Sequence, residues 1–473
     1  MAERCDLDLL DEAVGALFDS SADPDGVRRA QRLCDGLADA LRPVLLEVAQ
    51  RLGETSPYAH PLYLGHMLKP PHPAARLAYA LALWPNPNNH AFDGGRASSQ
   101  MEIEAVEQIA RLFGWSGALG HLCSGGTVAN LEALWIARES TRLYRPPQAP
   151  APAGGQTAGI AASAQAHYCH ERAAALLGVP FHVVPVDTRG RMDPAALTDL
   201  LQRHAIGTVV ATLGTPAAGA IDPLDQIADL CAARGVRLHA DASYGGYFTL
   251  AATLEPGARR AFDALSRADS IVVDPHKHGL QPYGCGCLLL RDAASRPIYT
   301  HAPGYAYLAS DDPHLGAISL ECSRPGAAAV ALWATLRVLP LQRGGGFARG
   351  LEASRQAALQ LWQALRDDAR FRPRFVTLFP PELDVVVWAV RAPSASVASV
   401  RARDLHATAQ ARGLHFSLAR LPRAMIEPLH VVAHWDADDL VVLRACLMKP
   451  EHLEWMARIL DGLDAAADVK ETP

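Results

Sequence analysis

The chain has 473 residues, of which 49% are hydrophobic and 20% charged, and its formal net charge is −6 at pH 7. This balance is typical of globular proteins, and the length is sufficient for a large α/β domain and a smaller one. The negative charge provides no basic surface for nucleic acid and no polybasic patch for a membrane. No apolar run reaches the ~18 residues of a membrane span.

The N-terminus is charged, and the nine cysteines are scattered without a CxxC pair. This pattern predicts a reduced, cytoplasmic protein, and no metal site is expected.

Residues 1–95 are predicted to form an N-terminal segment of helices and loops. Apolar spacing indicates helices between residues 5 and 50. The proline-rich stretch from Ser56 to Ser99 predicts irregular structure that lines a site or wraps a partner subunit.

A large domain is expected over residues 96–340, where helical and strand-like segments alternate. Helices are predicted at Glu102–Phe113, Val128–Glu139 and Ala327–Leu339. The strand-like runs are apolar throughout, which indicates a buried, mostly parallel sheet with helices on both faces. These runs are Phe181–Val186, Thr208–Leu213, Val236–Ala240, Ser270–Val273 and Gly286–Leu290.

Residues 341–473 are predicted to form a smaller C-terminal α/β domain. Its expected helices are Leu351–Leu365, 396–412 and Glu451–Leu463, and its expected strands are Leu383–Val390 and Leu429–Ala433.

Lysine is rare in this chain, because only four of the 44 basic residues are lysines. Lys69 and Lys449 precede prolines in predicted loops, and Lys470 lies in the polar tail. Lys277 instead follows the apolar run Ser270–Val273 directly. Desolvation at the end of a buried strand lowers the pKa of an amine and makes it a carbonyl nucleophile. We therefore interpret Lys277 as a Schiff-base lysine, with a structural lysine as the alternative.

Three further elements stand at predicted strand ends or helix starts, where open α/β sheets bind ligands. Cys123–Thr127 precedes a helix and could hold an anion, or could be a simple connection. Asp241 ends an apolar run and could pair with a protonated ring nitrogen, or could cap a helix. His167 lies between a strand and a helix, where capping or packing is the alternative.

Together these motifs resemble the group II pyridoxal-phosphate-dependent decarboxylases, which act on tyrosine and other aromatic amino acids, glutamate, histidine or diaminobutyrate. The resemblance covers roughly residues 60–460. The matching segments are Cys123–Asn130, Ala166–Ala173, Leu213–Asp222, His239–Gly246, Asp274–Lys277, Ser323–Gly326 and Leu443–Pro450.

The resemblance implies the α/β fold type I of enzymes that use pyridoxal 5'-phosphate (PLP). It has a large domain with a mostly parallel seven-stranded sheet and a smaller C-terminal domain. It also implies a homodimer with the active site at the subunit interface. By motif, Lys277 is the Schiff-base lysine, Asp241 the partner of the pyridine nitrogen and His167 the imidazole stacked on the ring.

Further site residues follow from the same resemblance. Gly126, Thr127 and His276 match phosphate contacts, and Thr215 matches a residue near the cofactor, although Pro216 replaces the usual second threonine. Arg324 is expected to support the large domain rather than touch substrate. The tyrosine that returns a proton to the product, supplied by the neighbouring subunit, is Tyr305, with Tyr307 as the alternative.

The expected reaction is the decarboxylation of an L-amino acid to the amine, with the cofactor ring accepting the electrons left when CO₂ departs. Carbon–carbon lyase, aminotransferase and aldehyde-forming oxidative reactions are alternatives on the same scaffold. A PLP-binding homologue without turnover is the non-enzymatic alternative. The chain departs from the family pattern at Val128 and at Glu321–Cys322, so the sequence does not specify the amino acid.

Overall fold

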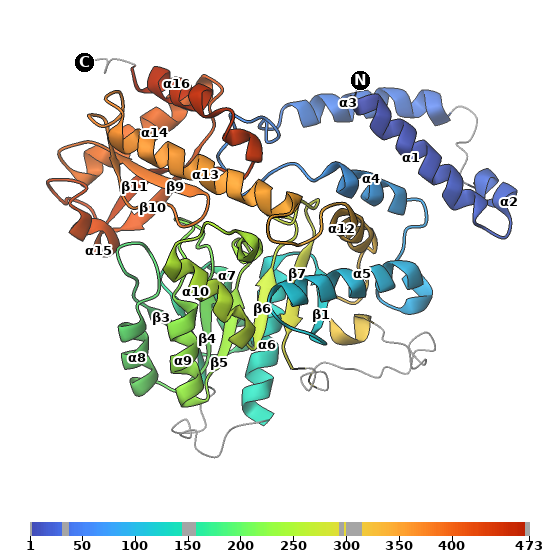
Figure 1. The fold of residues 1–473 in the computed structure, drawn as a ribbon, viewed down its shortest axis with the longest axis horizontal. Helices are drawn as coiled ribbons and strands as arrows, with labels where there is room; N and C mark the ends of the chain where they lie inside the picture. The colour runs from blue at the N-terminus through green and yellow to red at the C-terminus, as the bar shows by residue number, and fades with distance from the viewer. Residues whose placement is uncertain (1, 31–36, 144–157, 293–297, 299–314, 469–473) are drawn as a thin grey trace.

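The computed structural model describes residues 2–30, 37–143, 158–292, 298 and 315–468. Within these ranges the larger sheet has seven strands in the order β1-β7-β6-β5-β4-β2-β3 (Figure 1). Strands β3, β2, β4, β5 and β6 pair in parallel, whereas β7 is antiparallel to both β6 and β1. The mostly parallel seven-stranded sheet is therefore confirmed.

The strand bounds agree with the five predicted runs to within two residues at each end, and β1 and β2 are additional. The strands are β1 Leu119–Cys123, β2 Gly159–Ser163, β3 Phe181–Val184, β4 Ile206–Thr212, β5 Arg237–Asp241, β6 Ser270–Val273 and β7 Gly286–Leu290.

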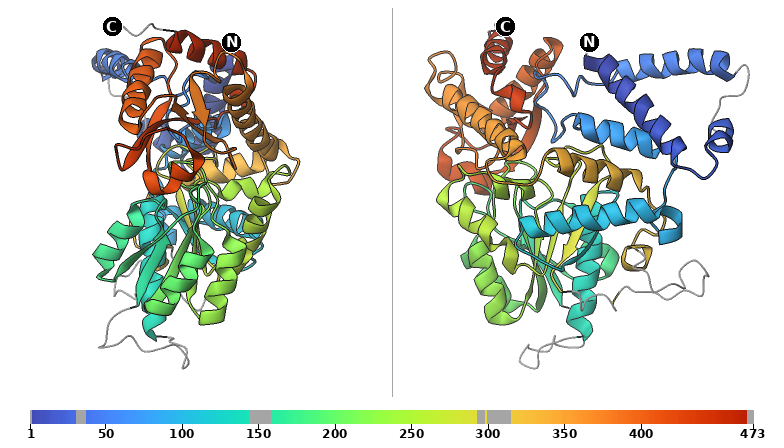
Figure 2. Two further views of the ribbon diagram at one scale, coloured as in Figure 1. Left: turned by 90° about the vertical axis from the view of Figure 1, so that its left-hand side faces the viewer. Right: turned by 45° about the vertical axis from the view of Figure 1, so that its right-hand side comes forward.

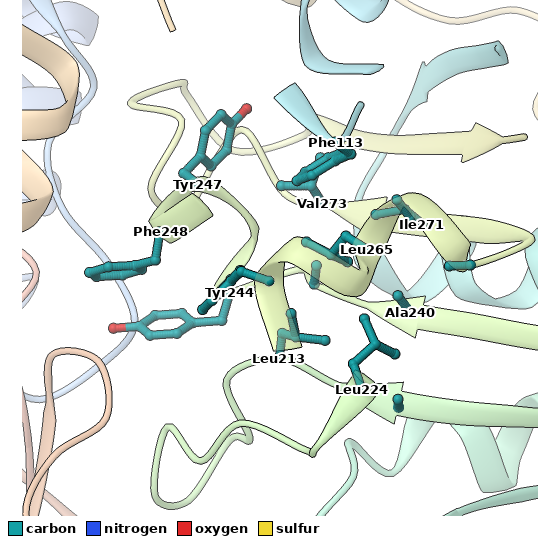
Figure 3. Packing of buried hydrophobic residues seen from close by; sticks show 14 of the residues in the cluster. Phe113, Leu213, Leu224, Ala240, Tyr244, Tyr247, Phe248, Leu265, Ile271 and Val273 are labelled. Carbon is teal, nitrogen blue, oxygen red and sulfur yellow. The ribbon is translucent and has the colours of Figure 1, made fainter. Parts of the chain in front are cut away.

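Both faces of this sheet are covered, which explains why its strands are apolar throughout. Along β6, Ile271 and Val273 join one hydrophobic cluster, while the intervening Val272 joins another on the opposite face. Helices α5 and α9 pack on the first face, and α6 and α7 on the second (Figure 2). Figure 3 shows part of the first cluster, including Phe113, Leu265, Ile271 and Val273.

The helices of this part of the chain alternate with the strands, apart from α12, which follows them. They are α5 Phe92–Leu112, α6 Gly126–Leu143, α7 Cys169–Leu177, α8 Pro194–Arg203, α9 Leu224–Arg234, α10 Pro256–Asp263 and α12 Ala327–Val338.

The carboxyl ends of several strands meet at one edge of the sheet. Thr212 at the end of β4 is in register with Asp241 at the end of β5, and Asp241 is in register with Val272 of β6. Strand β1 runs in the same direction as β6, because β7 is antiparallel to both. Ser124, which follows β1, therefore lies at the same edge as Asp274, which follows β6. Open α/β sheets bind their ligands at this edge.

The N-terminal segment contains α1 (Ala2–Asp19), α2 (Pro24–Ala30), α3 (Leu37–Gly53) and α4 (Pro73–Ala82). Helices α1 and α3 extend away from the sheets (Figure 1). Helix α4 contradicts the expectation of irregular structure from Ser56 to Ser99, as does α5, which begins at Phe92. The prolines were misleading because Pro73 occupies the first turn of α4, where its fixed φ is favourable, and His72 caps the helix. No helix in the described ranges could span a membrane.

The C-terminal part holds a second sheet, with the antiparallel strand order β10-β11-β9-β8. The expected strand Leu429–Ala433 is wrong, because His430 adopts a left-handed φ of 51° and Val431 and Val432 are buried in a loop. The strands are β8 Phe375–Thr377, β9 Val385–Val390, β10 Ser417–Pro422 and β11 Asp439–Cys446. The helices are α13 Gly346–Asp367, α14 Ala395–Ala411, α15 Arg423–Ile426 and α16 Met456–Ala467.

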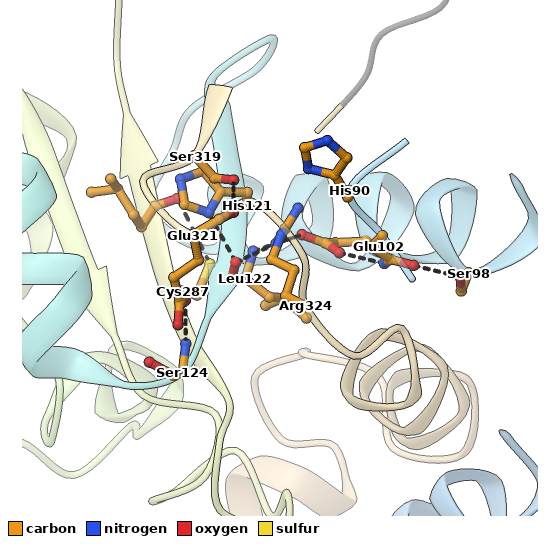
Figure 4. A network of polar contacts seen from close by, with 12 residues as sticks. His90, Ser98, Glu102, His121, Leu122, Ser124, Cys287, Ser319, Glu321 and Arg324 are labelled. Carbon is orange, nitrogen blue, oxygen red and sulfur yellow. Dashed lines mark hydrogen bonds and ion pairs between the residues drawn. The ribbon is translucent and has the colours of Figure 1, made fainter. Parts of the chain in front are cut away.

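A buried ion pair holds α5, β1 and the segment before α12 together. Arg324 Nη1 lies 2.6 Å from Glu102 Oε1 and also donates to the carbonyl of Leu122 (Figure 4). Glu102 accepts further hydrogen bonds from the Leu122 amide at 2.8 Å and from Asn89 Nδ2 at 2.6 Å. These contacts agree with the expectation that Arg324 supports the large domain.

Replacing Arg324 by methionine is expected to destabilise the protein by about 3–5 kcal/mol, because the buried Glu102 carboxylate would lose its cation. Chemical denaturation followed by circular dichroism measures this change. Arg337→Met is the matched control, since Arg337 of α12 pairs on the surface, at 3.3 Å, with Glu104, which lies on α5 like Glu102. Such surface pairs contribute about 0–1 kcal/mol. Equal losses in the two variants would contradict this account.

Candidate active site

A cavity of about 990 Å³ lies at the carboxyl edge of the larger sheet and is called the main cavity below. Its wall includes the loop before α6, the ends of β4, β5 and β6, and residues of β10 and β11 from the second sheet. Lys277, Asp241, His167, Gly126, Thr127 and His276 all line it. The structure thus brings together six of the residues that the sequence predicted for one site.

Lys277 is held by an ion pair at the end of β6. Its Nζ lies 2.9 Å from Oδ2 of Asp274, whose side chain is 2% exposed. The turn that carries Lys277 is closed by backbone hydrogen bonds from Lys277 to Asp274, from His276 to Cys285 and from Gln281 to Pro275. Both ends of this turn enter the sheet, through β6 and β7.

The pKa of Lys277 is raised, not lowered as the sequence suggested. Burial lowers the pKa of the amine, but the charge of Asp274 and the hydrogen bond to it more than reverse that effect, and Asp241 adds to it. The prediction considered only the apolar strand and left out the carboxylate three residues before the lysine.

Asp241 is buried at the end of β5, where three donors hold it. His170 Nε2 lies 2.9 Å from Oδ2, and the amide and hydroxyl of Ser243 donate to Oδ1 at 3.1 Å and 2.5 Å. Burial raises the pKa of Asp241, but the hydrogen bond and charge of His170, the Ser243 hydroxyl and Lys277 together hold it well below its usual range. The carboxylate is therefore ionised at neutral pH.

Sequence reasoning missed His170, which secures Asp241. Its position three residues after His167, at the start of α7, places both side chains near the same end of the helix. His167 is partly buried, and its Nδ1 accepts a hydrogen bond from the Cys169 amide at 3.2 Å. Burial lowers the pKa of His167, so its imidazole is neutral at pH 7.

The loop before α6 packs closely on the end of β6. A Cβ on Gly126 would lie 2.7 Å from Oδ2 of Asp274, so only glycine fits there. The first-turn amides of α6 give this loop favourable geometry for an anion. The Ser124 amide donates to Glu321 Oε2 at 2.7 Å (Figure 4). His276 lies beside the loop, with its ring 4.8 Å from that of Tyr283.

The remaining predicted residues are Thr215 and the loop tyrosines. Thr215 is fully buried and does not line the main cavity, because its hydroxyl accepts a hydrogen bond from the Ala220 amide at 3.0 Å and braces a turn. Its neighbours Gly214 and Pro216 do line the cavity, so Thr215 lies next to the wall, and its contact with the cofactor stays a prediction. Tyr305 and Tyr307 lie outside the described residues.

Arg444 on β11, which belongs to the matching segment Leu443–Pro450, contributes a buried cation to the wall. Its guanidinium donates to the carbonyls of Ala217 at 3.1 Å and Gly65 at 3.2 Å and to Ser417 Oγ at 3.1 Å. These bonds connect the second sheet to the N-terminal segment and to the loop after β4. The contact depends on the packing of the two sheets, which local sequence patterns do not reveal.

Comparison with known proteins identifies the family. The pyridoxal-dependent decarboxylase conserved domain matches residues 77–391. The chain belongs to the pyridoxal-dependent decarboxylase family. A relative in this family, the L-2,4-diaminobutyrate decarboxylase of Rhizobium meliloti, is 33% identical over 368 residues, covering 74% of this chain and 68% of that protein.

Other similar proteins agree with this assignment. The L-tyrosine decarboxylase of Enterococcus faecium is 29% identical over 442 residues, covering 74% of this chain and 72% of that protein. The crystal structure of Oryza sativa TDC with PLP and tryptamine superposes with a TM-score of 0.75 at 19% identity, covering 98% of this chain and 96% of that one, which shows the shared fold. The protein is a PLP-dependent carboxy-lyase that decarboxylates an L-amino acid.

The residues of the main cavity fit PLP chemically. The cofactor needs an amine for its aldehyde, an ionised carboxylate for its ring nitrogen and donors for its phosphate. Lys277, Asp241 and the start of α6 supply these groups on one wall. Asp274 Oδ1 and Thr212 Oγ1 are buried there without a hydrogen-bond partner in the described part of the chain, as expected of a site built for a polar ligand.

Replacing Asp274 by asparagine is expected to lower the pKa of Lys277, because the variant loses the charge that raises it. A larger fraction of the amine is then neutral at a given pH. The cofactor-free variant should therefore capture pyridoxal covalently at lower pH than the wild type does. Absorbance measures the capture rate at each pH, and the pH–rate profile of the variant should be displaced toward lower pH. Glu321→Gln is the control, because Glu321 is a carboxylate at the same loop, where it contacts Ser124, but is not among the groups that raise the pKa of Lys277. An unchanged pH profile in the Asp274 variant would refute this explanation.

Proposed function

We propose a specific division of labour among the residues of the main cavity. Lys277 holds the cofactor through Nζ, Asp241 faces the ring nitrogen and His167 lies against the ring. Gly126, Thr127 and His276 receive the phosphate at the start of α6. The observation that carries this proposal is the pair of carboxylates at adjacent strand ends, with Asp274 beside the amine and Asp241 secured by His170.

When bound, PLP supplies a ring that accepts the electron pair left when the bond between Cα and the carboxylate breaks. Asp241 keeps a proton on the ring nitrogen, because its low pKa makes it a lasting negative charge. His170 fixes the carboxylate in place, so little reorganisation is needed during the reaction. The neutral His167 can lie against the ring without adding positive charge.

Lys277 and the loop tyrosine are proposed to handle protons. Asp274 lies 2.9 Å from the Lys277 amine and would stabilise its ammonium form whenever that amine is not attached to the cofactor. Tyr305 is proposed to return the proton to Cα of the product, with Tyr307 as the alternative. Both proposals for the tyrosine rest on the family resemblance.

The wall also supports a proposal about substrate class. Among its described residues the carboxylates are Asp241 and Asp274, and both are engaged with cationic or hydrogen-bonding partners. Arg444 contributes positive charge, Arg420 contributes a second guanidinium that pairs with Asp439 at 3.3 Å, and Tyr58, Met67 and Leu418 contribute apolar surface. We propose that the protein accepts L-amino acids with acidic or aromatic side chains and discriminates against cationic ones.

A homodimer is proposed from the N-terminal segment. Helix α3 has no buried residue, and it exposes Val44, Leu45, Leu46, Val48 and Leu52, each at least 45% exposed. Val44, Leu45, Val48 and Leu52 share one face of the helix by their spacing, and an exposed apolar face of this kind is typical of a protein interface. A second copy of the chain is the proposed partner, in agreement with the interface site that the resemblance implies.

A cytoplasmic location is also proposed. The described cysteine side chains are free thiols, and most of them are buried. Free buried cysteines are typical of proteins in a reducing compartment.

Product analysis by mass spectrometry tests the reaction. We expect the cofactor-loaded protein to convert tyrosine, aspartate or cysteine sulfinic acid, but not 2,4-diaminobutyrate, into an amine lighter by one CO₂. Lys277→Ala should lose activity by about a thousandfold or more, which is roughly 4 kcal/mol of transition-state stabilisation, whereas Lys470→Ala should keep it. Formation of an aldehyde or a keto acid would contradict decarboxylation, and turnover of diaminobutyrate alone would contradict the substrate class.

Replacing Leu45 and Leu46 by glutamine is expected to weaken the dimer, because these side chains would lose their burial against the second copy. Sedimentation equilibrium measures the dissociation constant, which should rise at least tenfold. Val400→Gln on α14 is the control, since Val400 is similarly exposed, at 53%, outside the N-terminal segment. A monomeric wild type would refute the proposed dimer.

A further inference from the structure

A second cavity, of about 370 Å³, lies behind the turn that carries Lys277. We call it the lysine cavity, and its polar lining is Lys69, His72, Arg76, His278, Lys449 and Glu451. It shares no lining residue with the main cavity. Its volume falls within the roughly 300–1,000 Å³ range of small-molecule sites.

Two of the four lysines of the chain meet in this cavity, although arginine supplies nearly all positive charge elsewhere. Lys69 is 8% exposed and Lys449 is 3% exposed. Lys69 Nζ donates to the Met448 carbonyl at 3.4 Å, and Lys449 Nζ donates to the carbonyls of Tyr63 at 2.6 Å and His60 at 3.2 Å. Within the described ranges, neither ammonium forms an ion pair with a carboxylate.

Both ammonium groups are therefore buried without a carboxylate at ion-pair distance in the described ranges, and Asp384 and Glu451 act on them only from farther away. Burial lowers the pKa of Lys69 to about 8, although Asp384 and Glu451 act in the opposite direction. Burial also lowers the pKa of Lys449 to about 8, and the charge of Lys69 adds to that effect. Both amines are still mostly protonated at pH 7. Buried charges of one sign are unfavourable unless an opposite charge accompanies them.

Other features of the cavity also favour an anion. His278 lines it, is fully buried, and has no hydrogen-bond partner for Nδ1 among the described residues. The first turns of α4 and α13 contribute His72, Arg76, Gly346 and Phe347 to the wall. Helix starts carry unpaired amides and partial positive charge. Glu451, the acidic lining residue, is exposed to solvent.

We propose that the lysine cavity binds a small oxyanion, a phosphate or a carboxylate, between the ammonium groups of Lys69 and Lys449. The site is distinct from the cofactor phosphate site at the start of α6. Asp384 connects the two cavities, because it accepts a hydrogen bond from Tyr244 of the main cavity at 2.6 Å and lies 3.2 Å from His278 Nε2. Asp384 thus lies between His278, which lines the lysine cavity, and Tyr244, which lines the main cavity.

Calorimetric titration of the cofactor-loaded protein tests this proposal, because PLP then occupies its own phosphate site. Inorganic phosphate and malonate are titrated separately at constant ionic strength set with chloride, which removes general screening effects. Saturable binding of phosphate or of malonate is expected, and the tighter of the two identifies the chemical class. Lys69→Met and Lys449→Met should each weaken binding at least tenfold, whereas Lys470→Met should not.

Absence of binding to the wild type would overturn the proposal, as would equal binding by the wild type and both cavity variants. Should a methionine variant fail to fold, acetylation of the wild-type protein gives the same decision. The bound anion should slow acetylation of Lys69 and Lys449 relative to Lys470, as measured by peptide mass spectrometry. Unchanged relative rates would refute the site. None of these readouts depends on turnover, so they remain informative if the substrate proposal fails.

Discussion

The ion pair between Lys277 and Asp274 sets the electrostatics of the main cavity. Burial alone would lower the pKa of a lysine at the end of an apolar strand, but the carboxylate at 2.9 Å reverses that effect and favours the charged amine. The same carboxylate forms the surface on which Gly126 packs, so it also positions the start of α6, the proposed phosphate site. One buried side chain thus connects the amine, the start of α6 and the end of β6.

The two carboxylates of the site, Asp241 and Asp274, have different hydrogen-bond and ion-pair partners, and these partners suggest different roles. Asp241 receives hydrogen bonds from His170 and Ser243 and remains a fixed negative charge. Asp274 faces Lys277, the lysine that we propose gains and loses a proton during each cycle. Because Asp241 ends β5 and Asp274 directly follows the neighbouring parallel strand β6, the sheet sets their spacing.

The sequence predicted what is local and missed what depends on packing. The apolar strands leading to Asp241 and Lys277 were recognisable because both faces of the sheet are buried. Strands β10 and β11 were missed because β10 carries polar and partly exposed residues and the apolar run near Val431 is a buried loop. Arg444 reaches the cavity only through the docking of the second sheet, which no local pattern contains. The roles of Lys277, Asp241, His167 and Tyr305 stay predictions, although the first three now share one cavity.

The closed turn between β6 and β7 has a thermodynamic consequence for cofactor capture. Backbone hydrogen bonds at both of its ends and within it already restrict the segment before any ligand arrives. A flexible segment would lose conformational entropy when its amine became attached, at roughly 1–2 kcal/mol for each backbone residue that becomes ordered. Here that entropy is lost during folding. The free energy of folding therefore offsets the ordering of the Lys277 amine, and the affinity for the ligand is not reduced by it.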